Sequence, residues 1–187
     1  MNAPRLGLNG LPALAMLVLA PCVSLAQQQP SVPAPPPNGV VLSGGLGVGS
    51  LDGLAAQFSL AVPLSGGDLI GRAAGTSEFT IFGTSETSQD IAVLYGRRSS
   101  GSKGWVRAAG GLGVAYGVRR GEQLPGACFF GCSYEQERHS TLGLAVQVDA
   151  VWAPISSLGL GLSLFGNLNQ PGPFGGVTLN LYLGQVR

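Results

Sequence analysis

The stretch T-L-G-L-A-V-Q-V-D-A-V-W, residues 141–152, alternates two kinds of side chain without interruption. Its even positions are all apolar: Leu142, Leu144, Val146, Val148, Ala150 and Trp152. Its odd positions are mostly small or polar: Thr141, Gly143, Ala145, Gln147, Asp149 and Val151. A period of two residues is typical of a β-strand whose faces differ. The stretch therefore predicts a strand with one broad apolar face.

The same alternation recurs along the chain after residue 38, where no segment shows a convincing helical repeat. It is clear in residues 54–64, 106–120, 158–168 and 177–184, and weaker in residues 40–49, 69–79 and 90–98. Together with residues 141–152, these segments predict an all-β fold of eight strands.

Composition indicates which face of these strands is inside. Only 10% of the residues are charged, against about 25% in a typical soluble domain, and residues 150–186 contain no charged residue. A soluble β-sandwich would need polar side chains on its outer face. Large apolar residues facing lipid, with Gly, Ala, Ser and Asn filling a narrow interior, are instead typical of a transmembrane β-barrel. We therefore predict an eight-stranded antiparallel up-and-down transmembrane β-barrel, with a soluble exported β-sandwich as the alternative.

The connections support this prediction. Short turns are expected at residues 65–67, 99–103 and 154–157, and the other connections at residues 50–53, 77–89, 121–138 and 169–173. Both long connections fall on one side, which predicts short periplasmic turns and long external loops. Tyr95 and Trp152 lie in the lipid-facing phase near the short turns, whereas Trp105 is out of phase. Trp105 therefore predicts a bulge or a strand that starts later.

The N-terminal region predicts export. Residues 1–26 have the pattern of a signal peptide, with Arg5, an apolar run over residues 11–20 and small residues before a cleavage site after Ala26. An uncleaved anchor and lipidation at Cys22 are the alternatives. Residues 27–38 (QQQPSVPAPPPN) form a Pro/Gln-rich linker, so the barrel domain is expected over residues 39–187.

The cysteines of the expected mature chain are Cys128 and Cys132, and an even count in an exported chain predicts a disulfide. A metal site is a weak rival, because His139 is the chain's one histidine. The same loop predicts a binding surface made by Phe129, Phe130 and Tyr134, with a merely braced loop as the alternative.

The interior of an eight-stranded barrel is just wide enough for side chains to fill it, so no open pore is expected. The alternation places these charges inside: Arg72, Glu78, Arg98, Arg107, Arg119 and Asp149. If strands five and six end level, Gly104 lies beside Trp152 and Arg107 faces Asp149. We therefore predict an interior ion pair between Arg107 and Asp149.

Residues 39–187 resemble the small eight-stranded outer-membrane β-barrels, such as the OmpA membrane domain, OmpX and opacity-like proteins. The resemblance rests on the number of strands, their alternation, the placement of both long connections at one end, and the C-terminal strand. Residues 176–183 (GVTLNLYL) resemble the insertion signal read by the barrel-assembly machinery, but the chain ends in Gly184-Gln185-Val186-Arg187 in place of an aromatic residue. The resemblance implies an outer-membrane location, contact with outer-membrane lipid and lipopolysaccharide, and an extracellular or cell-surface partner.

The function expected from this resemblance is a structural or surface-interaction role without enzymatic activity. A lipid A-modifying enzyme, deacylase-like or an acyltransferase, is one alternative, and a small-solute channel is another. His139 is the candidate base for catalysis, but Ser140 is adjacent to it and would point the opposite way. The formal net charge of +1 offers no basic patch for nucleic acid. The glycine runs at residues 45–49 and 110–117 open no helix, so neither a nucleotide nor another cofactor is expected.

Overall fold

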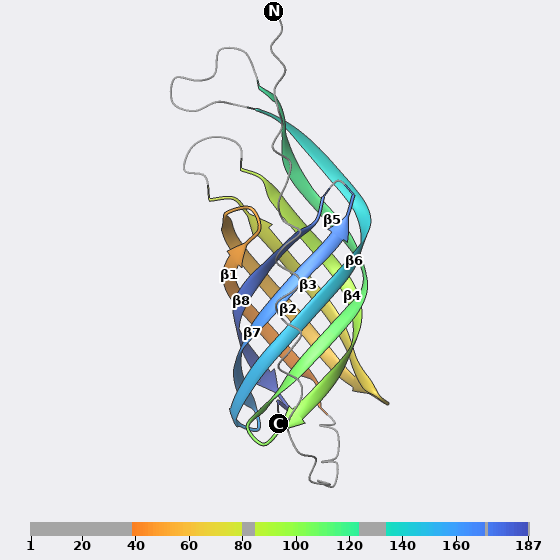
Figure 1. The fold of residues 1–187 in the computed structure, drawn as a ribbon, viewed down its shortest axis with the longest axis vertical. Coiled ribbons are helices and arrows are strands. Elements are labelled where there is room, and N and C mark those ends of the chain that lie inside the picture. Colours follow the sequence, from red (N-terminus) through yellow and green to blue (C-terminus); the bar gives the residue numbers. More distant parts are fainter. Residues whose placement is uncertain (1–38, 80–84, 124–133, 171, 187) are drawn as a thin grey trace, which may run out of the picture. The chain divides into compact units, whose positions relative to one another are not determined.

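The computed structural model describes residues 39–79, 85–123, 134–170 and 172–186. They form eight strands: β1 Val41–Gly49, β2 Gly53–Leu64, β3 Gly67–Ser77, β4 Thr87–Gly101, β5 Gly104–Gln123, β6 Tyr134–Ile155, β7 Leu158–Asn169 and β8 Phe174–Gly184. Each strand pairs with the next one in the sequence, and β1 pairs with β8, so that the antiparallel sheet closes into a barrel (Figure 1). The predicted fold class is confirmed. The described ranges hold no helix that is both long and apolar enough to cross a membrane.

Closure joins the whole of β1 to β8. The register of β1 on β8 runs from Val41 opposite Gly184 to Gly49 opposite Gly176 without a shift. Glycine is required on this seam, because a Cβ added at Gly45 would lie 1.9 Å from Asn180 Oδ1. A closed sheet leaves no edge strand along the wall, so the backbone groups of each strand are bonded on both sides.

The two faces of the strands have the predicted orientation. Large apolar side chains cover the outside of the wall, with Leu142 76% and Leu179 63% exposed. Small and polar side chains, such as the fully buried Ala145, Ser163 and Asn180, make up much of the inside, together with a smaller number of large apolar side chains. This arrangement is inverted relative to a water-soluble domain, whose large apolar residues form the core.

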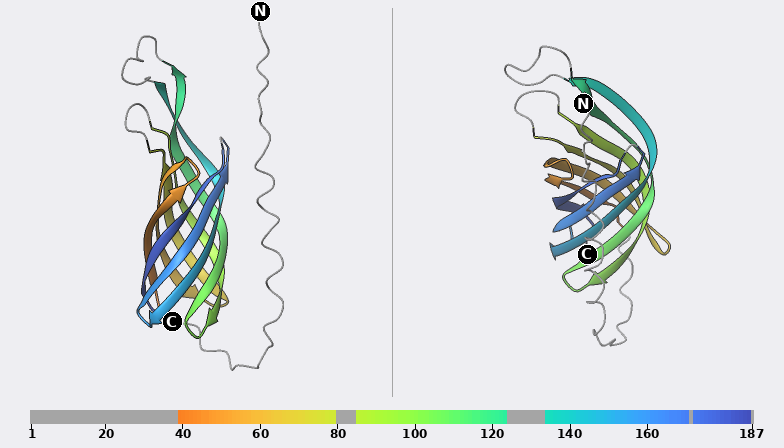
Figure 2. Two further views of the ribbon diagram at one scale, coloured as in Figure 1. Left: turned by 60° about the vertical axis from the view of Figure 1, so that its left-hand side comes forward. Right: turned by 45° about the horizontal axis from the view of Figure 1, so that its top comes forward.

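Several strands, among them β4, β5 and β6, are longer than the sequence pattern predicts. The hairpin of β5 and β6 projects beyond the neighbouring strands at the loop end (Figures 1 and 2). Part of the predicted connection 121–138 is therefore strand, and Gln123 pairs with Tyr134 after a register shift. Alternation fails as a signal there because the extension carries polar and charged residues on both faces. Opposite charges in register, such as Arg119 with Glu137, favour the pairing instead.

Some predicted features lie outside the described residues. They are the signal peptide and linker of residues 1–38, the Cys22 alternative, the Cys128–Cys132 disulfide, and the loop residues Phe129 and Phe130. These features stay predictions.

The orientation of the wall predicts the effect of a charge on it. Leu164 on β7 is 54% exposed on the outside of the barrel. If lipid covers this surface, Leu164→Arg should lower the free energy of unfolding by about 2–4 kcal/mol, and Gln89→Arg, at an outward position near the loop end, by about 0–1 kcal/mol. Denaturant titration in lipid vesicles measures both values. A wall that faces water would give changes within about 0.5 kcal/mol for both variants.

Candidate functional site in the barrel interior

The interior of the barrel contains a buried ion pair between β5 and β6. Arg107 lies directly opposite Asp149 in the register of the two strands. Its Nε and Nη2 atoms donate hydrogen bonds to Asp149 Oδ2 at 2.9 and 2.6 Å. The two side chains are no more than 1% exposed. The structure therefore brings together the two residues that the register argument pairs.

Asp149 also accepts hydrogen bonds from neighbouring strands. Its Oδ1 atom accepts one from Ser163 Oγ of β7 at 2.6 Å and one from Tyr182 Oη of β8 at 3.1 Å. Gln147 Nε2, on the same strand as Asp149, donates to Oδ1 at 2.9 Å. One carboxylate thus links the four consecutive strands β5 to β8.

A second carboxylate extends this network to β3 and β4. Arg98 donates from Nε and Nη2 to Asp68 Oδ2 at 3.0 and 2.8 Å. Arg107 Nη1 reaches the same oxygen at 3.4 Å, so Arg107 bridges Asp68 and Asp149. Two arginines balance two aspartates, and buried charges need this pairing because an isolated buried charge is very costly.

A separate ion pair lies nearer the loop end. Arg72 of β3 donates from Nη2 to Asp90 Oδ2 of β4 at 2.5 Å, and Asn167 Nδ2 of β7 donates to the same oxygen at 2.8 Å. Arg72 Nη1 also donates to the carbonyl oxygen of Val146 at 2.7 Å. The pair therefore connects strands on different sides of the barrel.

Sequence reasoning missed Asp68 and Asp90 as inward charges. The predicted strands began at residues 69 and 90, which left Asp68 between a turn and a strand and Asp90 at a strand boundary. A signal was present, because both residues share the parity of Arg72 and Arg98 along β3 and β4. Of the other predicted inward charges, Glu78 and Arg119 are half-buried at the loop end, and Glu78 pairs with Arg120.

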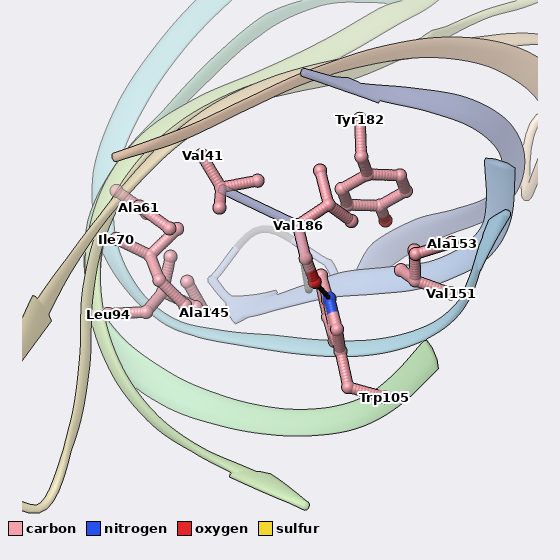
Figure 3. Close-up of a cluster of buried hydrophobic side chains, with 11 residues drawn as sticks. Val41, Ala61, Ile70, Leu94, Trp105, Ala145, Val151, Ala153, Tyr182 and Val186 are labelled. Atoms are coloured by element: carbon pink, nitrogen blue, oxygen red, sulfur yellow. Dashed lines mark hydrogen bonds between the residues drawn. The ribbon is translucent and has the colours of Figure 1, made fainter. Parts of the chain in front are cut away.

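Trp105 packs inside the barrel at the short-turn end (Figure 3). It is 4% exposed, β5 begins at Gly104, and the pairing is regular from there, so the predicted bulge or later start is wrong. Its ring meets Tyr182 edge-on with centroids 5.4 Å apart. The guanidinium carbons of Arg98 and Arg107 lie 4.7 and 5.1 Å from its centroid, within the range of cation–π attraction.

The residues after β8 fold inward over this end of the barrel. Gly184 has a φ of +117°, a conformation that glycine adopts without strain and that redirects the chain. The amide of Val186 then donates to the carbonyl oxygen of Ser156 at 2.8 Å. Its own carbonyl oxygen accepts a hydrogen bond from Trp105 Nε1 at 2.8 Å (Figure 3), and Val186 is fully buried.

The interior is therefore filled in layers along the barrel axis. Trp105, Tyr182 and Val186 belong to an apolar cluster at the short-turn end, and the Asp68 and Asp149 network lies next to it. The Arg72–Asp90 pair follows, together with a second apolar cluster that includes Phe165 and Phe174. These clusters and ion pairs occupy the interior from the short-turn end toward the loop end.

The loop end carries the remaining predicted residues. Tyr134 stacks near the guanidinium group of Arg120, which lies 5.7 Å from its ring centroid. His139 is half-buried, Ser140 is exposed, and His139 makes no hydrogen bond to a hydroxyl or carboxylate among the described residues. Within the same ranges, no group of three or more His, Cys, Asp or Glu side chains could hold a metal ion.

Comparison with known proteins gives a result for the fold alone. No family model matches the sequence, and no curated protein matches it. Ail, the attachment invasion locus protein of Yersinia pestis, is similar with a TM-score of 0.56 and 12% identity over 79% of this chain and 98% of that chain. Another structure of Ail, with a TM-score of 0.53 and 13% identity over 78% of this chain and 97% of that chain, is a complex with the heparin analogue sucrose octasulfate.

Two other solved structures of β-barrel proteins are similar to this chain. Neisserial surface protein A (NspA) has a TM-score of 0.54 and 10% identity over 78% of this chain and 94% of that chain. The N-terminal β-barrel domain of Pseudomonas aeruginosa OprF has a TM-score of 0.51 and 11% identity over 79% of this chain and 97% of that chain. The chain thus has the fold of the small eight-stranded outer-membrane β-barrels, as the resemblance predicted.

The hydrogen bonds and ion pair of Asp149 predict that a substitution of this residue lowers the free energy of unfolding strongly. Asp149→Asn keeps the shape of the side chain but removes the charge that balances Arg107. The free energy of unfolding should fall by about 3–5 kcal/mol, because a buried guanidinium group loses its main partner. Glu135→Gln, on the exposed part of β6, is the matched control and should change it by less than about 0.5 kcal/mol. Equal stability of Asp149→Asn and the parent in denaturant titration would contradict this role.

Proposed function

We propose that this protein is an outer-membrane β-barrel with a structural or surface-interaction role and without an open pore. The observation that carries the proposal is the combination of an apolar outer wall with a packed and charge-balanced interior. A wall of this kind is stable only against lipid or an equivalent apolar partner. The export signals predicted from the N-terminal residues support delivery to the outer membrane.

The filled interior supports a closed barrel. Buried arginines and aspartates are held in ion pairs across the interior, and Trp105 and Val186 cover the short-turn end. An ion that passed through would have to break these pairs or displace apolar side chains. Both steps leave buried charges without partners, which costs several kcal/mol for each ion.

The proposed orientation has the short turns in the periplasm and the β5–β6 hairpin outside the cell. In this orientation, the wall contacts outer-membrane lipid and lipopolysaccharide, and the barrel-assembly machinery inserts the chain. The hairpin, Tyr134 and the loop predicted to be closed by Cys128 and Cys132 would then meet an extracellular or cell-surface partner.

The charges at the loop end narrow the class of partner. Acidic side chains outnumber basic ones among the described residues there. The acidic residues are Asp52, Glu78, Glu86, Glu122, Glu135 and Glu137, and the basic residues are Arg119, Arg120 and Arg138. Ail forms a complex with a heparin analogue, but an excess of negative charge disfavours a polyanion here. We therefore propose a partner that is neutral or basic.

A closed barrel makes a direct prediction for ion conduction. The folded protein, inserted into planar lipid bilayers, should give no discrete conductance steps, while a general porin in the same bilayers serves as the positive control. Insertion is checked by protease protection of the reconstituted barrel. Reproducible single-channel steps from inserted protein would contradict the absence of a pore and favour the small-solute channel.

A further inference from the structure

The charges of the described residues are distributed unevenly along the barrel. The interior holds three arginines and three aspartates, which balance each other: Arg72, Arg98, Arg107, Asp68, Asp90 and Asp149. The other acidic residues of the chain all lie at the loop end. The exposed charges at the short-turn end are Arg97 and Lys103, and both are basic.

Arg97 is placed where a lipid headgroup would meet the wall. It follows Gly96, which pairs with Asp68 close to the start of β3, so Arg97 lies near the turn of residues 65–66. It alternates in phase with the exposed residue Tyr95 and therefore points outward. Lys103 lies in the turn between β4 and β5. Neither side chain forms a hydrogen bond or ion pair with the described residues.

A hollow lies on the outer wall next to these two residues. Its lining includes Ser99 of β4, Gly104 and Val106 of β5, Ala150 and Trp152 of β6, and Leu162 of β7. Small residues lie between large ones in it: Gly104 is opposite Trp152, and Ala150 lies between Val106 and Leu162. Ser99 is two residues from Arg97 on the same face of β4, and Gly104 directly follows Lys103.

We propose that the hollow and its two basic neighbours bind an anionic phospholipid of the leaflet at the short-turn end. This inference rests on the proposed membrane location of the barrel. An acyl chain lies in the apolar hollow between Val106 and Leu162, and Arg97 and Lys103 contact the headgroup phosphate. Trp152 contacts the lipid at the level of the headgroup, where an aromatic ring with one polar atom is favoured.

The chemistry of the site favours this occupant over a protein. The hollow is apolar and shallow and lies within the lipid-facing wall, where flexible acyl chains are the available partners. The headgroup provides the negative charge that two unpaired basic side chains need at the membrane boundary. Long basic side chains reach that boundary while their aliphatic parts stay against apolar surface.

The test uses the two tryptophans of the chain. The full chain is reconstituted in phosphatidylcholine vesicles that contain equal amounts of either brominated phosphatidylglycerol or brominated phosphatidylcholine. Bromine quenches a tryptophan that it contacts. Trp152 is 55% exposed on the wall and reports on the site, whereas Trp105 is 4% exposed inside the barrel and gives a constant background.

The ratio of Trp152 quenching by brominated phosphatidylglycerol to quenching by brominated phosphatidylcholine gives the preference of the site for the anionic lipid. This preference should be about fivefold for each basic side chain that contacts the headgroup. The double variant Arg97→Gln, Lys103→Gln should reduce the preference to near one. Arg138→Gln removes a charge at the loop end and should leave the preference unchanged. Ala150→Leu fills the hollow and should weaken the preference although both basic residues remain.

The other outcomes overturn the inference in separable ways. Equal quenching by the two brominated lipids would show that the wall is in lipid but has no anionic lipid site. A preference that depends on Arg97 and Lys103 but is unchanged by Ala150→Leu would overturn the inference. It would show that the two basic residues attract anionic lipid to the barrel surface without an acyl chain binding in the hollow. Quenching by neither lipid would overturn the membrane location, and the lipid site with it.

Discussion

The hydrogen bonds and the ion pair of the Asp149 carboxylate connect much of the polar interior. This carboxylate is fully buried and accepts hydrogen bonds from Arg107, Gln147, Ser163 and Tyr182, which lie on four consecutive strands. Through Arg107 it is also coupled to Asp68 and so to β3 and β4. In a barrel without a large apolar core, such a network supplies the specific contacts that hold strands in register. A buried ion pair can be replaced by apolar packing in many proteins, but here the apolar side chains are needed on the outer wall.

The outer wall and the interior constrain each other. Because most of the large apolar residues face outward, small and polar side chains make up much of the interior, and the polar ones are buried at low cost only where they find partners. The ion pairs and the hydrogen bonds of Ser163 and Asn167 meet this requirement for those side chains. Asn180 is an exception, because neither amide atom of its side chain has a hydrogen-bond partner among the described residues. In the proposed barrel without a pore, the same interior packing blocks the passage of solutes. The lack of a pore and the stability of the fold would then have one physical origin.

Alternation predicted the fold and the orientation of its faces because a period of two recurs in all eight strand segments and is clear in several of them, as in residues 141–152. The pairing of Arg107 with Asp149 followed from the register once one pair of strand ends was assumed to be level. Strand ends were harder to predict, because the β5–β6 extension beyond the rim has no apolar face to mark it. Asp68 and Asp90 were missed because they lie at the first residues of the predicted strands or just before them. Trp105 shares the parity of Arg107, so alternation places both inside. The return of the chain end to cover Trp105 is a long-range contact that local sequence does not encode.

We infer that the apolar wall faces lipid and that the interior side chains leave no pore. The first statement is tested most directly by the mobility of the detergent-extracted membrane protein on an SDS gel, with and without boiling. We expect the unboiled protein to be recovered from the outer membrane and to resist SDS, so that boiling shifts its mobility. Recovery of the protein from the soluble periplasmic fraction, without a shift on boiling, would contradict the account.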